Sequence, residues 1–241
     1  MSGQPVWATF SASWDVWAFT ALLLAGVPLL ARRLYASLAS IPKVRIYAAV
    51  IAMQWCLSAL LLLVVRCHAL GLADLGMQAG LAGRSIAIAA VCVIAFAVLA
   101  IRNARRLKQM DPAKLASGLG RGRLFYPHDS GEMTVFVLLA LTTGACEELL
   151  YRGWLVNLVA ALGAPIWIAV LLAAIAFGIG HAYQGAKGMV ATGILGFIFG
   201  AIYVVTSSLF AGQVFHVAIN RANGVVGAYA LTLLRPLPLQ R

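Results

Sequence analysis

Long apolar runs alternate with short basic segments along this chain. The first three apolar runs are residues 14–31, 46–65 and 85–101, and arginines border each of them. A helix needs about 20 apolar residues to cross a bilayer, and these runs approach or reach that length. The pattern therefore predicts three membrane-spanning helices in the first part of the chain.

Apolar character continues almost unbroken from residue 133 to residue 234. Polar and turn-forming residues divide this stretch into further predicted spans, at about 133–161, 165–183, 187–205, 207–221 and 224–234. The last two are short and could also be one long or broken helix. The sequence thus predicts seven or eight spans in all.

The composition supports the same class of protein. Hydrophobic residues make up 63% of the chain and charged residues only 10%, which is too apolar for a soluble globular domain of this length. The alternating strands of about 10 residues that mark a membrane β-barrel are missing from the pattern. We therefore expect an all-α, polytopic transmembrane helical bundle in a bacterial-type cell (inner) membrane.

The net charge is +11, and most basic residues lie between the apolar runs, where they indicate the topology of the chain. Basic residues concentrate in the segments 32–45 and 102–132, which the positive-inside rule places in the cytoplasm, with the N-terminus outside. Seven spans would leave Arg235 and Arg241 inside, and eight would leave them outside. No basic stretch has the interleaved aromatic residues of a nucleic-acid surface, so the expected partner of these charges is the lipid bilayer.

Polar residues are placed differently in the two parts of the chain. Charges in the first three spans lie only at the ends, whereas ionisable and amide residues occur in the middle of the later ones: Glu147, Glu148, Arg152, Asn157, His181, Gln213, His216 and Asn220. Ionisable residues at membrane depth mark functional sites. We therefore expect residues 1–132 to be a three-span scaffold with a basic cytoplasmic loop, and residues 133–241 to be a catalytic helical core with its active site within the membrane.

Two glutamates and an arginine stand together in this core. Glu148 and Arg152 are four residues apart, so they share one helix face and can form an ion pair that lowers the cost of burying each. Glu147 points about 100° away from Glu148 and is not neutralised in the same way. This favours Glu147 as a general base that takes a proton from water. The alternative for the Glu148–Arg152 pair is a purely structural clamp between helices.

The histidines of the core also lie one turn from another polar or aromatic residue. His216 shares a helix face with Asn220, and both could donate hydrogen bonds to a developing oxyanion. His181 follows Phe177 by one turn. His68 and His128 fall in loops, where we expect them to be solvated. Two histidines and one or two glutamates could instead hold a catalytic zinc ion, so a metal site stays open at this point.

Three short motifs resemble a known family. The segments "EELLYR" (147–152), "FGIGH" (177–181) and "HVAIN" (216–220) are similar to the EExxxR, FxxxH and HxxxN/D motifs of the CPBP family. These are the CAAX-protease and bacteriocin-processing type intramembrane glutamic endopeptidases, which are related to the Ras-converting CAAX endopeptidase. The resemblance covers roughly residues 133–234 and implies a mostly eight-span helical fold with the active site within the membrane.

The resemblance also implies roles for individual residues. Glu147 would activate the attacking water with help from His181, while Glu148 and Arg152 would order the site. His216 and Asn220 would stabilise the oxyanion of the tetrahedral intermediate. No cofactor is expected, although zinc remains the alternative.

The expected function is hydrolysis of a peptide bond in a membrane-anchored or lipidated protein or peptide, such as a C-terminal tail. The alternative is a non-catalytic membrane scaffold or a bacteriocin self-immunity protein with the same fold. A proton-coupled transporter would also place glutamate and histidine at membrane depth, but the two halves of the sequence show no inverted repeat.

Overall fold

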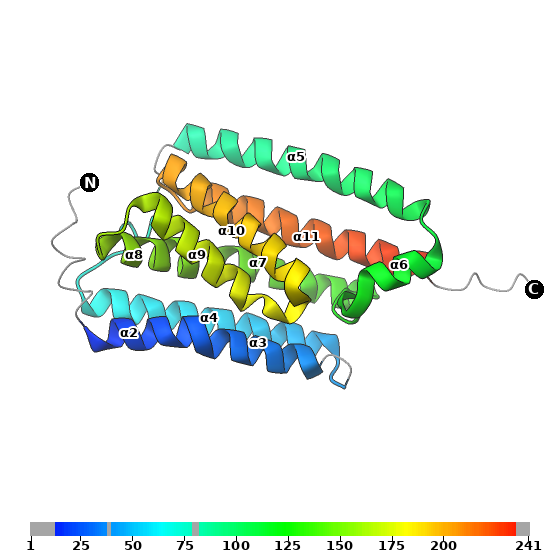
Figure 1. Ribbon diagram of the computed structural model, residues 1–241, viewed down its shortest axis with the longest axis horizontal. Coiled ribbons are helices and arrows are strands. Elements are labelled where there is room, and N and C mark those ends of the chain that lie inside the picture. Colours follow the sequence, from blue (N-terminus) through cyan, green and yellow to red (C-terminus); the bar gives the residue numbers. More distant parts are fainter. Residues whose placement is uncertain (1–12, 38–39, 79–81, 235–241) are drawn as a thin grey trace, which may run out of the picture.

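The computed structural model describes residues 13–37, 40–78 and 82–234, and these residues form a bundle of helices with no strand (Figure 1). This confirms the predicted all-α fold. The elements follow in the order α2 (Trp14–Ala21), η1 (Leu22–Gly26), α3 (Val27–Ala36), α4 (Lys43–Cys67), α5 (Ala82–Lys108), α6 (Pro112–Leu119), η3 (Gly120–Leu124), α7 (Ser130–Glu148), η4 (Leu149–Val156), α8 (Asn157–Ala161), α9 (Ile166–Gly180), η5 (Ala182–Gln184), α10 (Gly185–Thr206) and α11 (Phe210–Leu233).

Five helical segments within the described residues are long and apolar enough to cross a membrane, and they make the chain a polytopic membrane protein. They are Trp14–Ala36, Lys43–Cys67, Ala82–Lys108, Ser130–Ala161 and Ala182–Thr206. Helix α9 is apolar but shorter. The two last predicted spans are one helix, α11, which supports the smaller of the two predicted numbers. The exact number of crossings stays a prediction.

The outer helix α5 shows how the bundle meets lipid. It lies along one edge of the bundle beside α11, while the rod formed by α2, η1 and α3 lies along the opposite edge (Figure 1). Only Ser85 and Ala89 of α5 are buried, whereas Ile86, Val91 and Ile94 are exposed. An apolar surface of this length would be a liability in water and is expected in a bilayer.

The helices α9 and α10 approach each other closely because glycines face each other across their contact. A Cβ atom on Gly178 would lie 2.8 Å from the carbonyl oxygen of Met189 and 3.2 Å from the Cα of Gly193. On Gly196, it would lie 3.2 Å from the Cα of Ala174. Membrane helices associate through such close packing, because lipid gives no hydrophobic drive between them. These small residues therefore permit the close approach of α9 and α10.

The basic segment 102–132 is more helical than the sequence suggested. Helix α5 continues to Lys108, so Arg105, Arg106 and Lys108 lie in its last turn, where positive charge is favourable next to the helix dipole. Helix α6 and the 3₁₀-helix η3 follow. Arg235 and Arg241, whose side of the membrane was left open, lie outside the described residues.

A polar clasp joins the start of α4 to the start of α7. The Lys43 ammonium donates to the carbonyl oxygen of Tyr126 (2.7 Å), pairs with Glu132 (3.3 Å) and contacts His128. His128 is exposed outside the helices, as predicted for a solvated residue, and it also contacts Lys43. All four residues lie within 1–132, but helix α7 begins at Ser130 and runs across the predicted boundary at residue 132. The two-part division of the chain stays a prediction.

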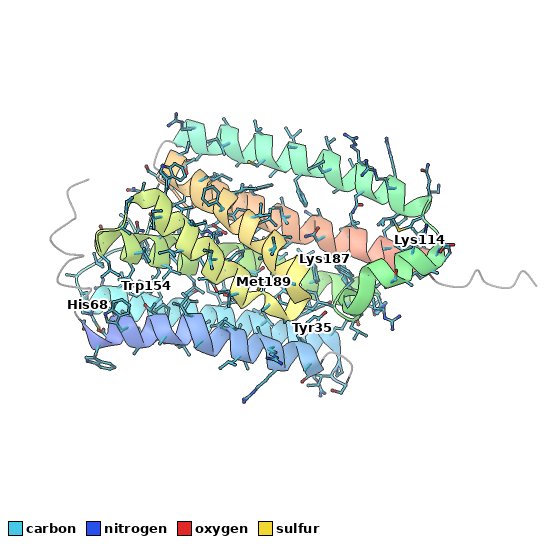
Figure 2. All side chains as sticks on the ribbon, viewed as in Figure 1. Tyr35, His68, Lys114, Trp154, Lys187 and Met189 are labelled. Carbon is cyan, nitrogen blue, oxygen red and sulfur yellow. The ribbon has the colours of Figure 1, made fainter. Side chains whose placement is uncertain are left out.

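The opposite end of α4 is tied to α2. His68, which follows α4, pairs through Nε2 with Asp15 at 3.0 Å. The prediction of a solvated His68 side chain is therefore wrong. Trp154 of η4 packs edge to face on Phe19 (5.3 Å between centroids), and its Nε1 donates to Thr20 at 3.2 Å. Figure 2 shows His68 and Trp154 at this end of the bundle. The two contacts of Trp154 hold η4 against α2.

Candidate active site

The predicted site residues come from three helical segments that meet inside the bundle. Glu147 and Glu148 form the end of α7, and Arg152 lies in η4, which continues the same rod. His216 and Asn220 lie on α11, which packs along α7. Four of these side chains, Glu147, Glu148, Arg152 and His216, form one buried cluster linked by short polar contacts.

Arg152 is held on every side, with only 1% of its surface exposed. Its Nη1 donates to Glu148 Oε1 at 3.1 Å, and its Nη2 donates to the carbonyl oxygen of Gly196 at 2.8 Å. The guanidinium lies over the rings of Phe177 and Phe199, at 4.6 and 5.1 Å from their centroids. The predicted Glu148–Arg152 ion pair is present. Arg152 also joins the continuous helix of α7 and η4 to α9 through Phe177, and to α10 through Gly196 and Phe199.

The backbone around Arg152 is a π-helix. Residues Leu149–Val156 have this wider turn, and all eight side chains are buried. π-helical turns within α-helices are rare and often occur at functional sites. The π-helix begins directly after the two glutamates and contains Arg152. The irregular backbone therefore lies at the buried cluster of charges.

His216 lies between the two carboxylates, with one at each ring nitrogen. Its Nδ1 is 2.9 Å from Glu148 Oε1, and its Nε2 is 3.7 Å from Glu147 Oε2. The ring stacks on Phe199 at 4.7 Å with an interplanar angle of 15°. Because an ionised carboxylate only accepts hydrogen bonds, Nδ1 of His216 carries the hydrogen in its bond to Glu148.

Glu147 has a neutral partner rather than a cation. Its Oε1 accepts a hydrogen bond from Nε2 of Gln54 at 2.9 Å, and 8% of Glu147 is exposed. Arg152 bonds to Glu148 and not to Glu147, as the helical spacing predicted. Gln54 belongs to α4, in the part of the chain predicted to be a scaffold, and sequence analysis missed it. The available signal was an amide in the middle of an apolar run.

Asn220 contacts α7 one turn before the glutamates. Its Nδ2 donates to Oγ1 of Thr143 at 3.0 Å, and Thr143 precedes Glu147 by four residues. An amide nitrogen carries two hydrogens, so Asn220 keeps one for another acceptor. Gln213 on the same helix donates to the carbonyl oxygen of Ala145 at 3.2 Å. Thr143 is a second residue of the site that the sequence analysis missed.

His181 lies at the end of α9, near the cluster but not bonded to Glu147 in the described part of the chain. Its Nδ1 is 2.9 Å from the carbonyl oxygen of Phe177, so Nδ1 donates and Nε2 remains an acceptor in the neutral ring. Phe177 contacts both histidine rings, with centroids 4.6 Å from His181 and 5.9 Å from His216. Phe177 therefore contacts His181 and two residues of the cluster, His216 and Arg152.

Asn157, the other polar position noted in this rod, has a packing role. Its Nδ2 lies 2.7 Å from the carbonyl oxygen of Gly153 and 2.8 Å from Oη of Tyr203. These bonds connect η4 and α8 with α10, away from the buried cluster of charges.

The donor set of the cluster is poorly arranged for zinc. Among residues 13–37, 40–78 and 82–234, no group of three His, Cys, Asp or Glu side chains is placed to hold a metal ion. Glu147 and Glu148 face opposite nitrogens of the His216 ring, and a single ion cannot bind both nitrogens together with both carboxylates. The need for a metal remains a question for experiment.

Residues 129–222 match the family described as Type II CAAX prenyl endopeptidase Rce1-like. This segment is similar to the Rce1-like family. The match confirms the resemblance to CAAX endopeptidases, and the segment contains all six predicted site residues. Gln54 lies outside it. No curated protein and no solved structure matches the chain.

The Rce1-like match and the apolar helices together describe a CAAX-type intramembrane protease. The buried cluster of charges lies within the matched segment, and its glutamates and arginine belong to Ser130–Ala161, which is long and apolar enough to span a bilayer.

Proposed function

We propose that the protein is an intramembrane glutamic endopeptidase that cleaves a lipidated, membrane-anchored substrate near its C-terminus. One observation carries the proposal: Glu147 is buried, is bonded to a neutral amide instead of a cation, and presents its second oxygen toward His216. A carboxylate neutralised by an arginine would be a poor base. A carboxylate that is not bonded to an arginine keeps an oxygen available to take a proton from water.

In the proposed reaction, a water molecule at Oε2 of Glu147 attacks the carbonyl carbon of the scissile bond. Glu147 takes one proton of this water as the new C–O bond forms, and the carbonyl oxygen becomes an oxyanion. Nε2 of His181, which is an acceptor in the neutral ring, assists at the water. The tetrahedral intermediate then collapses, the C–N bond breaks, and Glu147 returns its proton to the leaving amine.

The oxyanion would be stabilised by His216 and Asn220. Since Nδ1 of His216 already donates to Glu148, its Nε2 can donate only when the ring is protonated. Asn220 contributes the second N–H of its amide, which it does not donate to Thr143. Glu148 and Arg152 therefore order the site by holding His216.

The position of the cluster supports a lipid-anchored substrate. Glu147, Glu148 and Arg152 lie within Ser130–Ala161, a segment apolar and long enough to span a bilayer, so a scissile bond must be brought to membrane depth to reach them. A prenyl or other lipid anchor does this, and CAAX endopeptidases as a class act on such tails. That the membrane is a bacterial-type cell membrane stays a prediction.

The proposal is tested with purified protein in liposomes and two peptides of one sequence, each ending in a four-residue CAAX tail. One peptide is farnesylated on its cysteine and the other is not. We expect mass spectrometry to show release of the C-terminal fragment from the farnesylated peptide at least about tenfold faster. If a folded, monodisperse protein cleaves neither peptide, the non-catalytic scaffold alternative is favoured instead.

We expect cleavage to be independent of metal, because the proposed base, its assisting histidine and the oxyanion donors are all side chains. EDTA or phenanthroline should leave the rate of fragment release within about twofold of the untreated rate. Mass spectrometry of the purified protein should find well under one zinc per chain. Stoichiometric zinc, together with activity that chelators remove and added zinc restores, would recast the histidines as ligands.

A further inference from the structure

Gln54 is a buried amide in the middle of helix α4, in a run of otherwise mostly apolar residues. Only 4% of its surface is exposed. Its Nε2 donates to Glu147 Oε1 at 2.9 Å, and its own Oε1 is buried with no hydrogen-bond partner in the described residues. A buried amide that is only half satisfied costs stability, so a role other than packing is expected for it.

The orientation of the amide follows from chemistry. Turning it over would bring its carbonyl oxygen against Oε1 of Glu147, and two acceptors repel each other unless the carboxyl is protonated. The bond through Nε2 fixes the plane of the Glu147 carboxylate and leaves Oε2 directed toward His216. The unpartnered oxygen of Gln54 belongs to the same terminal amide group, so it lies beside this carboxylate.

We infer that Gln54 is a positioning residue of the active centre: its N–H holds Glu147, and its carbonyl oxygen orients the water that Glu147 activates. A water molecule has two hydrogens, and these two acceptors can each take one. The inference rests on the proposed function. It also adds a residue from α4 to a site that otherwise lies within the matched segment 129–222.

The test compares Gln54→Met with Ser58→Ala in the farnesylated-peptide assay. Methionine keeps the length of the side chain and removes both polar groups. Ser58 is the matched control because it is buried one turn further along the same helix face and makes no bond to Glu147. We expect Gln54→Met to lower kcat by about 10- to 100-fold with KM within about twofold, as misplacement of a reacting group does. Ser58→Ala should leave kcat within about twofold.

Thermal unfolding separates positioning from packing. Gln54→Met removes a buried oxygen that has no protein partner but also leaves Oε1 of Glu147 without its donor. These two effects on stability oppose each other, so Tm should stay close to that of the wild type although kcat falls. A merely structural Gln54 would instead lower Tm and kcat together, and that result overturns the inference. Gln54→Asn keeps the amide on an arm that is one methylene shorter, and its kcat should lie between those of the wild type and Gln54→Met.

Glu147→Gln distinguishes failure of this inference from failure of the proposed function. If the wild type does not cleave the peptide, or if Glu147→Gln cleaves it normally, the proposed function fails. If Glu147→Gln is inactive but Gln54→Met keeps the wild-type kcat, only the role of Gln54 is wrong. In the Glu147→Gln background, adding Gln54→Met should cause no further loss of residual cleavage, because Gln54 acts through Glu147.

Discussion

Replacing Glu147 by glutamine is expected to slow peptide cleavage by about 10²- to 10⁴-fold, the usual contribution of a general base. The amide has the same shape as the carboxylate, and its oxygen can still accept the bond from Gln54. It cannot take a proton from water. The variant should therefore insert and purify as a folded protein, with a Tm close to that of the wild type. Fragment release from the farnesylated peptide, followed by mass spectrometry, gives the rate.

Glu132→Gln is the matched control for this change. Glu132 lies on the same helix, α7, but in its first turn, where it pairs with Lys43. The loss of this partly exposed pair should leave cleavage within about twofold, because it is far along the helix from the cluster. If Glu147→Gln keeps activity within tenfold of the wild type, Glu147 is not the base and the mechanism must be assigned to another group.

The apolar pattern predicted the helices well but misplaced one break. Residues near Asn220 and Gly224 suggested an interruption, since polar and small residues usually end apolar helices. In the structure α11 continues through both positions. Asn220 bonds to Thr143, and the ring of Phe136 packs against Gly224, where a Cβ atom would overlap it. Packing against α7 thus explains these residues, and single-sequence patterns do not contain it.

Contacts within one helix could be predicted, whereas contacts between helices could not. The ion pair of Glu148 with Arg152 follows from a spacing of four residues. The bonds from Gln54 to Glu147 and from Asn220 to Thr143 join residues 93 and 77 positions apart. No periodicity indicates which of several apolar faces meet. The sequence therefore predicted the charged residues of the site, but not the neutral residues that hold them.

Sequence analysis counted amides as well as charges in the later spans, but only charges in the first three. This criterion assigned residues 1–132 to a scaffold, because their spans have charges only at the ends. Gln54 has no charge, so the criterion passed over it. Its bond to Glu147 shows that α4 reaches the cluster, whether or not the chain divides at residue 132. Neutral amides within apolar runs deserve the same weight as charges when an intramembrane site is sought.

Removing Arg152 is expected to cause the largest loss of stability of any single change in the cluster. Arg152→Ala would leave Glu148 buried without its cation and the carbonyl oxygen of Gly196 without its donor. It would also open a space between the rings of Phe177 and Phe199. Breaking a buried ion pair costs about 3–5 kcal/mol, which corresponds to a fall in Tm on the order of 10 °C for a chain of this size. Thermal unfolding in detergent measures it.

Two further variants separate the charge from the packing. Arg102→Ala removes an exposed arginine of α5 and should leave Tm unchanged. Adding Glu148→Gln to Arg152→Met removes both charges while keeping volume, so this double variant should regain much of the stability that Arg152→Ala loses. Its activity should stay low, because His216 would lose the carboxylate that holds Nδ1. Equal Tm values for Arg152→Ala and Arg102→Ala would contradict a buried pair, since only an exposed one could be lost so cheaply.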